Sequence, residues 1–93
     1  MAQLHLLTRS PFSHDLTHAL ACISDTDQLV LMGDGCYLLH AELDRFPLPK
    51  PILFIDADCT ARGIDASNMT DFRAISIEQC VSLSLAAQHV LTW

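Results

Sequence analysis

The feature that most constrains this chain is the uninterrupted apolar run Leu29–Met32, which ends abruptly at Gly33-Asp34-Gly35. A short apolar run closed by turn residues is typical of a strand buried on both faces, and such strands belong to parallel sheets covered by helices. Asp34-Gly35 could also close a β-hairpin, but the next residues, Cys36–Leu43, are rich in Leu, Ala and Glu and favour a helix. We therefore interpret Gly33–Gly35 as a strand-to-helix turn, at the end of a strand where open α/β sheets place ligands and reactive groups.

Apolar runs elsewhere predict further strands, and the segments between them suit helices. The expected strands are Gln3–Leu7, Leu29–Met32, Ile52–Ile55 and Ala74–Ile77. The expected helices begin at Ser10-Pro11, at Cys36, at Cys59 and at Ser76. Because strands and helices alternate, a mainly parallel sheet with right-handed crossovers is favoured. The sequence thus predicts a single small three-layer α/β domain over residues 1–93.

The strongest helix signal follows the first strand. Ser10 suits an N-cap, and Pro11 suits the first helical position, where its missing N–H costs nothing. An apolar stripe at helical spacing then follows at Phe12, Leu16, Ala19, Leu20 and Ile23. These residues predict a helix that starts at Ser10-Pro11 and ends at Ser24–Asp27.

The second half of the chain carries weaker signals. Phe46–Pro51 holds three alternating prolines and predicts an extended connection. Asp56–Asp58 can cap a short helical turn from Cys59 to Arg62 that Gly63 ends, and Ile64–Arg73 is expected to be irregular. Ser76 and Gln79 have capping-box spacing for a last helix. On that helix, one face is expected to hold Val81, Ser84, Leu85 and Gln88.

Composition restricts the partners and the compartment. Hydrophobic residues make up 51% of the chain and charged residues only 17%, which indicates a surface covered by a permanent protein partner. The net charge is −6 and the five Lys and Arg are scattered, so we expect no direct binding to nucleic acid. No apolar run is long enough to cross a bilayer, and we expect no signal peptide because the first residues lack its basic start and small-residue cleavage site. We expect a cytoplasmic protein with no membrane partner.

Two of the four cysteines are candidates for sulfur chemistry. Cys36 and Cys59 each follow an expected strand at or near a helix N-terminus, where the helix dipole lowers a thiol pKa. Such a thiol could accept a sulfane sulfur as a persulfide, although a small buried packing residue is the simpler interpretation. Cys22 and Cys80 lie within expected helices and are interpreted as packing residues. No Cys-x-x-Cys pair is present, and disulfides are not expected in a cytosolic protein.

The remaining candidate sites are weaker, and we expect neither a metal nor a cofactor. His14 and His18 lie one helical turn apart and could share a metal, but the Glu of a His-Glu-x-x-His motif is missing and a solvated helix face is favoured. Gly33-Asp34-Gly35 could bind a phosphate, but a plain tight turn is favoured. His5 lies in an apolar strand and is interpreted as a hydrogen-bonded structural histidine, with an interface role as the alternative.

A set of landmarks in a fixed order resembles the DsrH/TusB family of sulfur-relay subunits over nearly the whole chain. The landmarks are Leu4-His5, Arg9-Ser10-Pro11-Phe12, Gly33-Asp34-Gly35-Cys36-Tyr37, Ala61-Arg62-Gly63 and Trp93. In the TusB branch the resemblance implies TusC-like and TusD-like partner subunits in a heterohexamer, a dimer of trimers. That complex passes persulfide sulfur to a TusE-like acceptor for 2-thiolation of the tRNA wobble uridine, and the transferring cysteine belongs to the TusD-like subunit.

The resemblance leaves two functions open. The favoured one is a non-catalytic subunit of a sulfur-relay complex that supports tRNA wobble-uridine thiolation. The alternative is a persulfide-carrying sulfurtransferase subunit of a DsrEFH-type sulfur-oxidation complex, with Cys36 or Cys59 as the carrier. The DsrH branch carries its cysteine in the first helix. Cys22 lies about a turn away from that position, so that role is not carried over to it.

Overall fold

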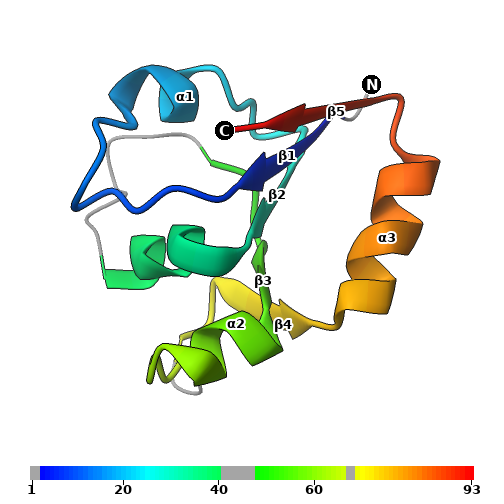
Figure 1. Ribbon diagram of the computed structural model, residues 1–93. Coiled ribbons are helices and arrows are strands. Elements are labelled where there is room, and N and C mark those ends of the chain that lie inside the picture. Colours follow the sequence, from blue (N-terminus) through cyan, green and yellow to red (C-terminus); the bar gives the residue numbers. More distant parts are fainter. Residues whose placement is uncertain (1–2, 41–47, 67–68) are drawn as a thin grey trace.

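The computed structural model describes residues 3–40, 48–66 and 69–93. Within them, a five-stranded sheet lies between two layers of helices (Figure 1). The strands are β1 (Gln3–Leu7), β2 (Gln28–Leu31), β3 (Ile52–Ile55), β4 (Phe72–Ile75) and β5 (His89–Thr92). The helices are α1 (Thr17–Ala21), the 3₁₀ helix η1 (Gly33–His40), α2 (Asp56–Ala61) and α3 (Ile77–Ala86).

The sheet is parallel throughout, with the strand order β4-β3-β2-β1-β5. In register, His5 of β1 lies between Leu29 of β2 and Leu91 of β5. Figure 1 shows α1, η1 and α2 on one side of the sheet and α3 on the other. The chain passes through α3 from β4 at one edge of the sheet to β5 at the opposite edge. The predicted three-layer α/β architecture is therefore confirmed.

Alternation along the strands explains why their sequences are continuously apolar. One set of strand residues packs under α1, η1 and α2: Leu7, Leu29, Leu31, Ile52 and Phe54. The neighbouring residues point to the α3 side, where they pack with Cys80: Leu4, Val30, Leu53, Ile55 and Ile75. Because both faces of β1, β2 and β3 are covered, nearly every residue of these strands must be apolar.

The first helix is shorter than its apolar stripe predicts. α1 starts at Thr17, and Asp15 accepts a hydrogen bond from the Thr17 amide at 3.0 Å. Ser10 does not cap a helix: its hydroxyl accepts a hydrogen bond from the Phe12 amide at 3.1 Å within a turn. Leu16 reaches the core, but Phe12 is 68% exposed. The prediction of a helix from Ser10 was therefore wrong. Phe12 does not pack against the core, so the apolar stripe does not extend back to Ser10.

The expected strand-to-helix turn is itself the start of η1. The helix begins at Gly33 and is a 3₁₀ helix rather than an α-helix beginning at Cys36. A Cβ on Gly35 would lie 2.0 Å from the backbone oxygen of Leu7, so η1 starts directly against the end of β1. The last part of the expected helix, residues 41–43, and the start of the proline-rich connection, residues 46–47, lie outside the described residues.

Boundaries also shift in the second half of the chain. α2 starts at Asp56, so the expected capping residues are already helical, and Gly63 ends the segment with φ +68°. β4 begins at Phe72, two residues before the expected strand, so Phe72 and Arg73 are not irregular. The capping box is confirmed, with Ser76 Oγ accepting from the Gln79 amide at 3.1 Å and the Gln79 side chain accepting from the Ser76 amide at 2.8 Å.

The helix α3 buries a different face from the one that its apolar residues suggest. Cys80 is buried against the sheet, and Leu83 packs beside it. Val81 and Leu85, which lie on the expected face, are 53% and 84% exposed. The sheet-facing side of α3 is therefore made of small and aliphatic residues, and an apolar stripe remains on its outer side.

The strand β5 was not predicted. Its four residues, His-Val-Leu-Thr, are all exposed, so no buried face imposes an alternating pattern that the sequence could show. The strand is held by its parallel pairing with β1 and by the residue that follows it, since Trp93 N donates to Leu6 O at 2.8 Å.

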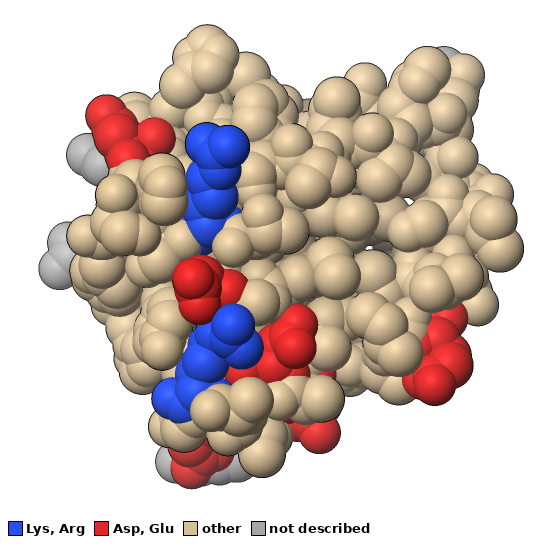
Figure 2. All heavy atoms as spheres, in the orientation of Figure 1, with Lys and Arg blue, Asp and Glu red and all other residues tan. Residues whose placement is uncertain are grey.

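Charged groups are distributed unevenly over the surface. Figure 2 shows Lys, Arg, Asp and Glu gathered mainly on the side of the molecule that carries η1 and α2. The surface around α3 shows few charges in the same view. Residues 77–93, which form α3, β5 and the residue after it, contain a single charged side chain, Glu78.

Candidate functional site

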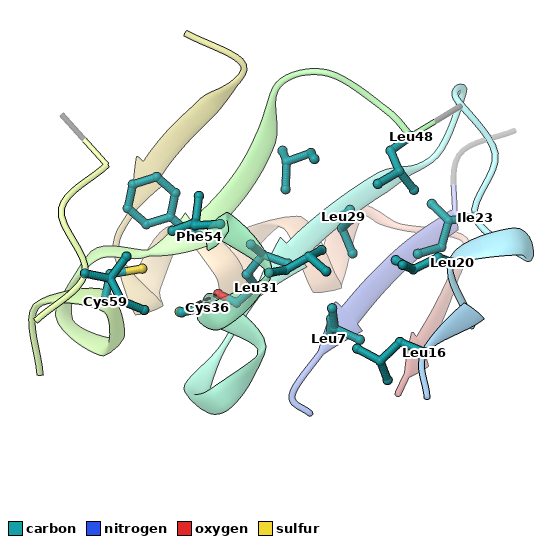
Figure 3. Packing of buried hydrophobic residues seen from close by; sticks show 14 residues of the cluster. Leu7, Leu16, Leu20, Ile23, Leu29, Leu31, Cys36, Leu48, Phe54 and Cys59 are labelled. Atoms are coloured by element: carbon teal, nitrogen blue, oxygen red, sulfur yellow. Dashed lines mark hydrogen bonds between the residues drawn. The ribbon is translucent and has the colours of Figure 1, made fainter. Parts of the chain in front are cut away.

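The carboxyl edge of the sheet brings the two candidate cysteines together. β2 leads into η1 and β3 leads into α2, and because β2 and β3 are neighbours their following turns lie side by side. Cys36 and Cys59 therefore belong to one buried cluster despite their separation in sequence (Figure 3). Within this cluster the Cys36 Sγ contacts the Leu31 carbonyl oxygen at 3.7 Å.

Burial controls the chemistry of this thiol pair. Cys36 is 0% exposed and Cys59 is 1% exposed, although a hollow of about 460 Å³ lies beside Cys59. Burial raises the pKa of Cys36 to about 12, and the neighbouring Cys59 side chain adds to the effect. Burial also raises the pKa of Cys59, and the negative charges of Asp56 and Asp58 act in the same direction. Both shifts are opposite to the one that a helix N-terminus favours, so both groups are neutral thiols at neutral pH.

The other two cysteines occupy contrasting places. Cys80 is 4% exposed on the sheet side of α3, as expected of a packing residue, and burial raises its pKa. Cys22 is exposed, so its interpretation as a packing residue was wrong. It caps the C-terminal end of α1, where its Sγ lies 4.0 Å from His18 Nε2.

We expect iodoacetamide to modify Cys22 in the native protein well before the three buried cysteines. Alkylation requires a thiol that is both accessible and ionised. Cys36, Cys59 and Cys80 are buried, and burial also raises their pKa values. Mass spectrometry of peptides after timed labelling measures this order, and labelling in denaturant, where all four should react alike, is the control. Modification of Cys36 or Cys59 as fast as Cys22 would contradict the buried thiol pair.

An acid–base cluster fastens the turns at this edge. Arg62 Nε donates to Asp34 Oδ1 at 3.1 Å, and Arg62 Nη1 donates to the Asp58 backbone oxygen at 3.1 Å. The Asp58 carboxylate accepts the Gly33 amide at 2.8 Å. The amide that a phosphate would need at the Gly33-Asp34-Gly35 turn is thus already bonded to a carboxylate of the chain. The plain-turn interpretation fits this geometry, and the cluster holds η1 against α2.

A second buried polar group is centred on His5 in the middle of β1, and we call His5, Asp27 and Trp93 the C-terminal latch. His5 Nε2 and Asp27 Oδ2 are 2.9 Å apart, and Trp93 Nε1 donates to His5 Nδ1 at 3.1 Å. Asp27 also accepts the backbone amides of Gln3 at 3.2 Å and Ser24 at 3.1 Å. His5 is 0% exposed, so the latch satisfies every polar atom of a fully buried imidazole. The prediction of a hydrogen-bonded structural histidine is confirmed.

The donors and acceptors of the latch define its protonation state. An indole nitrogen can only donate, so His5 Nδ1 must accept and carries no proton. The proton of the neutral imidazole is therefore on Nε2 and is donated to the Asp27 carboxylate. The planes of the two rings are nearly parallel, with an angle of 13° between them and 6.2 Å between their centroids. Burial raises the pKa of Asp27, but the hydrogen bonds from His5, Ser24 and Gln3 outweigh it and leave that pKa below its ordinary value.

Comparison with known proteins identifies the family. The "DsrH like protein" family matches residues 9–90. The chain belongs to the DsrH-like family. Protein TusB of Yersinia pestis (strain Pestoides F) is 27% identical over 94 residues, which cover 97% of this chain and 99% of that protein. Protein TusB of Buchnera aphidicola subsp. Acyrthosiphon pisum (strain 5A) is 29% identical over 96 residues, with the same coverage. The family gives this chain a role in sulfur relay.

The landmarks of this DsrH-like chain turn out to contact one another. His5, in the first landmark, bonds to Trp93, in the last, and Asp34 bonds to Arg62 across the carboxyl edge. These two tertiary contacts join segments that are far apart in the sequence. Four of the residues on which the resemblance rests therefore help to build the fold.

Other predictions about the site have plain outcomes. His14 and His18 are both exposed, as expected for a solvated face, and no metal-binding cluster of three ligands occurs in the parts of the chain that the structure describes. Among the same residues no helix could cross a membrane. Sequence reasoning missed Asp27 as a partner of His5. The only available signal was a carboxylate directly before a buried strand, and nothing local linked it to a residue 22 positions earlier.

Proposed function

We propose that this chain is a non-catalytic subunit of a cytoplasmic sulfur-relay complex that supports 2-thiolation of the tRNA wobble uridine. Its partners are TusC-like and TusD-like subunits in a heterohexamer, and a TusE-like acceptor takes sulfur from that complex. The observation that carries the proposal is the state of its thiols. The family has a sulfur-relay role, yet the two cysteines at the carboxyl edge are buried and have raised pKa values. The transfer chemistry is therefore assigned to a partner.

The surface supports assembly with other subunits. The outer side of α3 exposes three large apolar residues one turn apart, Ile77, Val81 and Leu85, at 49%, 53% and 84%. A solvated helix normally carries charged residues on this side. In residues 77–93, however, Glu78 is the only residue with a charged side chain. An apolar stripe without charges is characteristic of the core of a protein–protein interface. The net charge of −6 also favours protein partners over tRNA.

The test is to replace the cysteines and measure thiolation in cells. We expect Cys22→Ser, Cys36→Ser, Cys59→Ser and Cys80→Ala, singly and combined, to leave wobble-uridine 2-thiolation largely intact. Any loss of thiolation should come only from the replacements at the three buried positions, because these lower the stability of the fold. Mass spectrometry of tRNA hydrolysates measures the product, and co-purification of the partner subunits measures assembly. The matched control is replacement of the cysteine that the resemblance assigns to the TusD-like subunit, which should abolish thiolation.

The alternative function predicts a different result. A persulfide-carrying subunit requires an accessible thiol, and Cys22 is the exposed cysteine of this chain, beside His18. If Cys22→Ser, Cys36→Ser or Cys59→Ser alone abolished thiolation while the complex still assembled, the chain would be a sulfur carrier. Persulfide mass spectrometry on the purified chain would then locate the sulfur.

A further inference from the structure

Among the residues that the structure describes, no strand pairs with the outer edge of β5. β5 is the last strand in the sheet order, and all four of its residues are exposed. The opposite edge strand, β4, carries the exposed charge of Arg73 in its middle, a common protection against edge-to-edge pairing. β5 has no charged residue and no proline. It is thus an uncharged edge without the usual protection.

The register of β5 identifies the backbone groups that face outward. Trp93 N donates to Leu6 O at 2.8 Å, and Trp93 O accepts from Thr8 N at 3.0 Å, so both backbone groups of Trp93 face β1. In a parallel ladder the two groups of one residue point to the same side, and successive residues alternate. Leu91 and His89 therefore also face β1. The N–H and C=O groups of Val90 and Thr92 point to the open side.

We propose that a second copy of this chain pairs with this edge, with the two β5 strands antiparallel about a two-fold axis at Leu91. In that register Val90 lies opposite Thr92 of the other copy. Each such pair exchanges two hydrogen bonds, as an antiparallel ladder requires. By symmetry two such pairs form, and the four outward backbone groups of each copy are all satisfied. The inference does not depend on the proposed role in sulfur relay.

The side chains and charges also fit a second copy. Val90 and Thr92 point to the α3 side and form two uncharged β-branched pairs across the axis. Leu91, which is 39% exposed, meets its own counterpart on the other side of the sheet. Two copies of a chain with a net charge of −6 repel each other over most of their surface. At β5 this pairing brings no two charged side chains together.

Proline substitution at Val90 tests the pairing selectively. Val90→Pro removes an outward N–H and leaves the bonds from His89, Leu91 and Trp93 to β1 intact, which is where an edge strand tolerates proline. Val90→Thr is the matched control, because it keeps the N–H and the β-branched shape. We expect sedimentation equilibrium to show dimers for wild type and Val90→Thr, and a dimer dissociation constant about 30-fold higher for Val90→Pro. Trp93 fluorescence should stay native in all three.

A second pair of variants covers the case in which Val90→Pro disturbs folding. Leu91→Arg places two like charges at the two-fold axis and should yield monomers, whereas Val81→Arg adds the same charge on α3 and should leave the dimer intact. A wild-type chain that stays monomeric at millimolar concentration would overturn the proposal. So would a dimer that Leu91→Arg and Val81→Arg affect equally.

Discussion

Replacing Gly35 with alanine is expected to destabilise the fold by about 3 kcal/mol or more. A Cβ at this position would lie 2.0 Å from the backbone oxygen of Leu7 and 2.7 Å from its carbonyl carbon. The Leu7 oxygen cannot move away, because it also accepts the Met32 amide at 2.9 Å and so joins β1 to the end of β2. Relief of the overlap must displace η1 from the sheet, together with Cys36 and the packing around it.

Chemical denaturation followed by Trp93 fluorescence measures this loss, since Trp93 is the only tryptophan of the chain. Gly63→Ala is the matched control. Its Cβ would meet nothing within 4 Å, so only the strain of its φ of +68° remains, which costs about 1 kcal/mol. Equal losses for the two variants would show that η1 can move away from β1 without penalty.

Replacing Asp27 with asparagine is expected to cost about 3 kcal/mol at neutral pH. Asp27 accepts three hydrogen bonds, from His5 Nε2 and from the amides of Gln3 and Ser24. An asparagine amide group offers one oxygen and directs an NH₂ group at the remaining donors. His5 is fully buried and has no access to water as a substitute partner. Because His5 also holds Trp93, the loss should be seen as earlier release of the C-terminal strand.

The effect of Asp27 should depend on pH in a defined direction. Its pKa is below the ordinary value in the folded protein, so the unfolded state binds the proton more tightly. The stability that Asp27 contributes is complete above the unfolded pKa of about 3.9 and is lost as the pH falls through the lower folded pKa. The gap in unfolding free energy between wild type and Asp27→Asn should therefore narrow in acid.

Urea titrations at neutral and acidic pH, followed by Trp93 fluorescence, test the loss of stability in Asp27→Asn and its dependence on pH. Asp25→Asn is the control, because Asp25 is exposed two residues away and its replacement should change stability by less than about 0.5 kcal/mol. An Asp27→Asn variant as stable as Asp25→Asn, or a gap that does not change with pH, would show that the latch does not hold the C-terminal strand.

The amino-acid sequence by itself determined the elements whose signals are local. The strands β1, β2 and β3 follow from apolar runs, because a strand covered on both faces must be apolar at nearly every position. The capping box at Ser76 and Gln79 marks the start of α3, because its two hydrogen bonds join residues only three apart. The order of strand and helix was enough to predict a parallel sheet, since crossovers of this kind have one favoured hand.

Tertiary structure alone decided features that depend on distant residues. η1 starts at Gly33 because Gly35 packs against Leu7, at the end of another strand. β5 exists because β1 offers it an edge and Trp93 reaches His5, although the sequence of β5 has no buried face. The thiols of Cys36 and Cys59 have raised pKa values because two neighbouring turns bury them together. A local pattern specifies which element forms, but burial and charge at a site are set by what other segments bring to it.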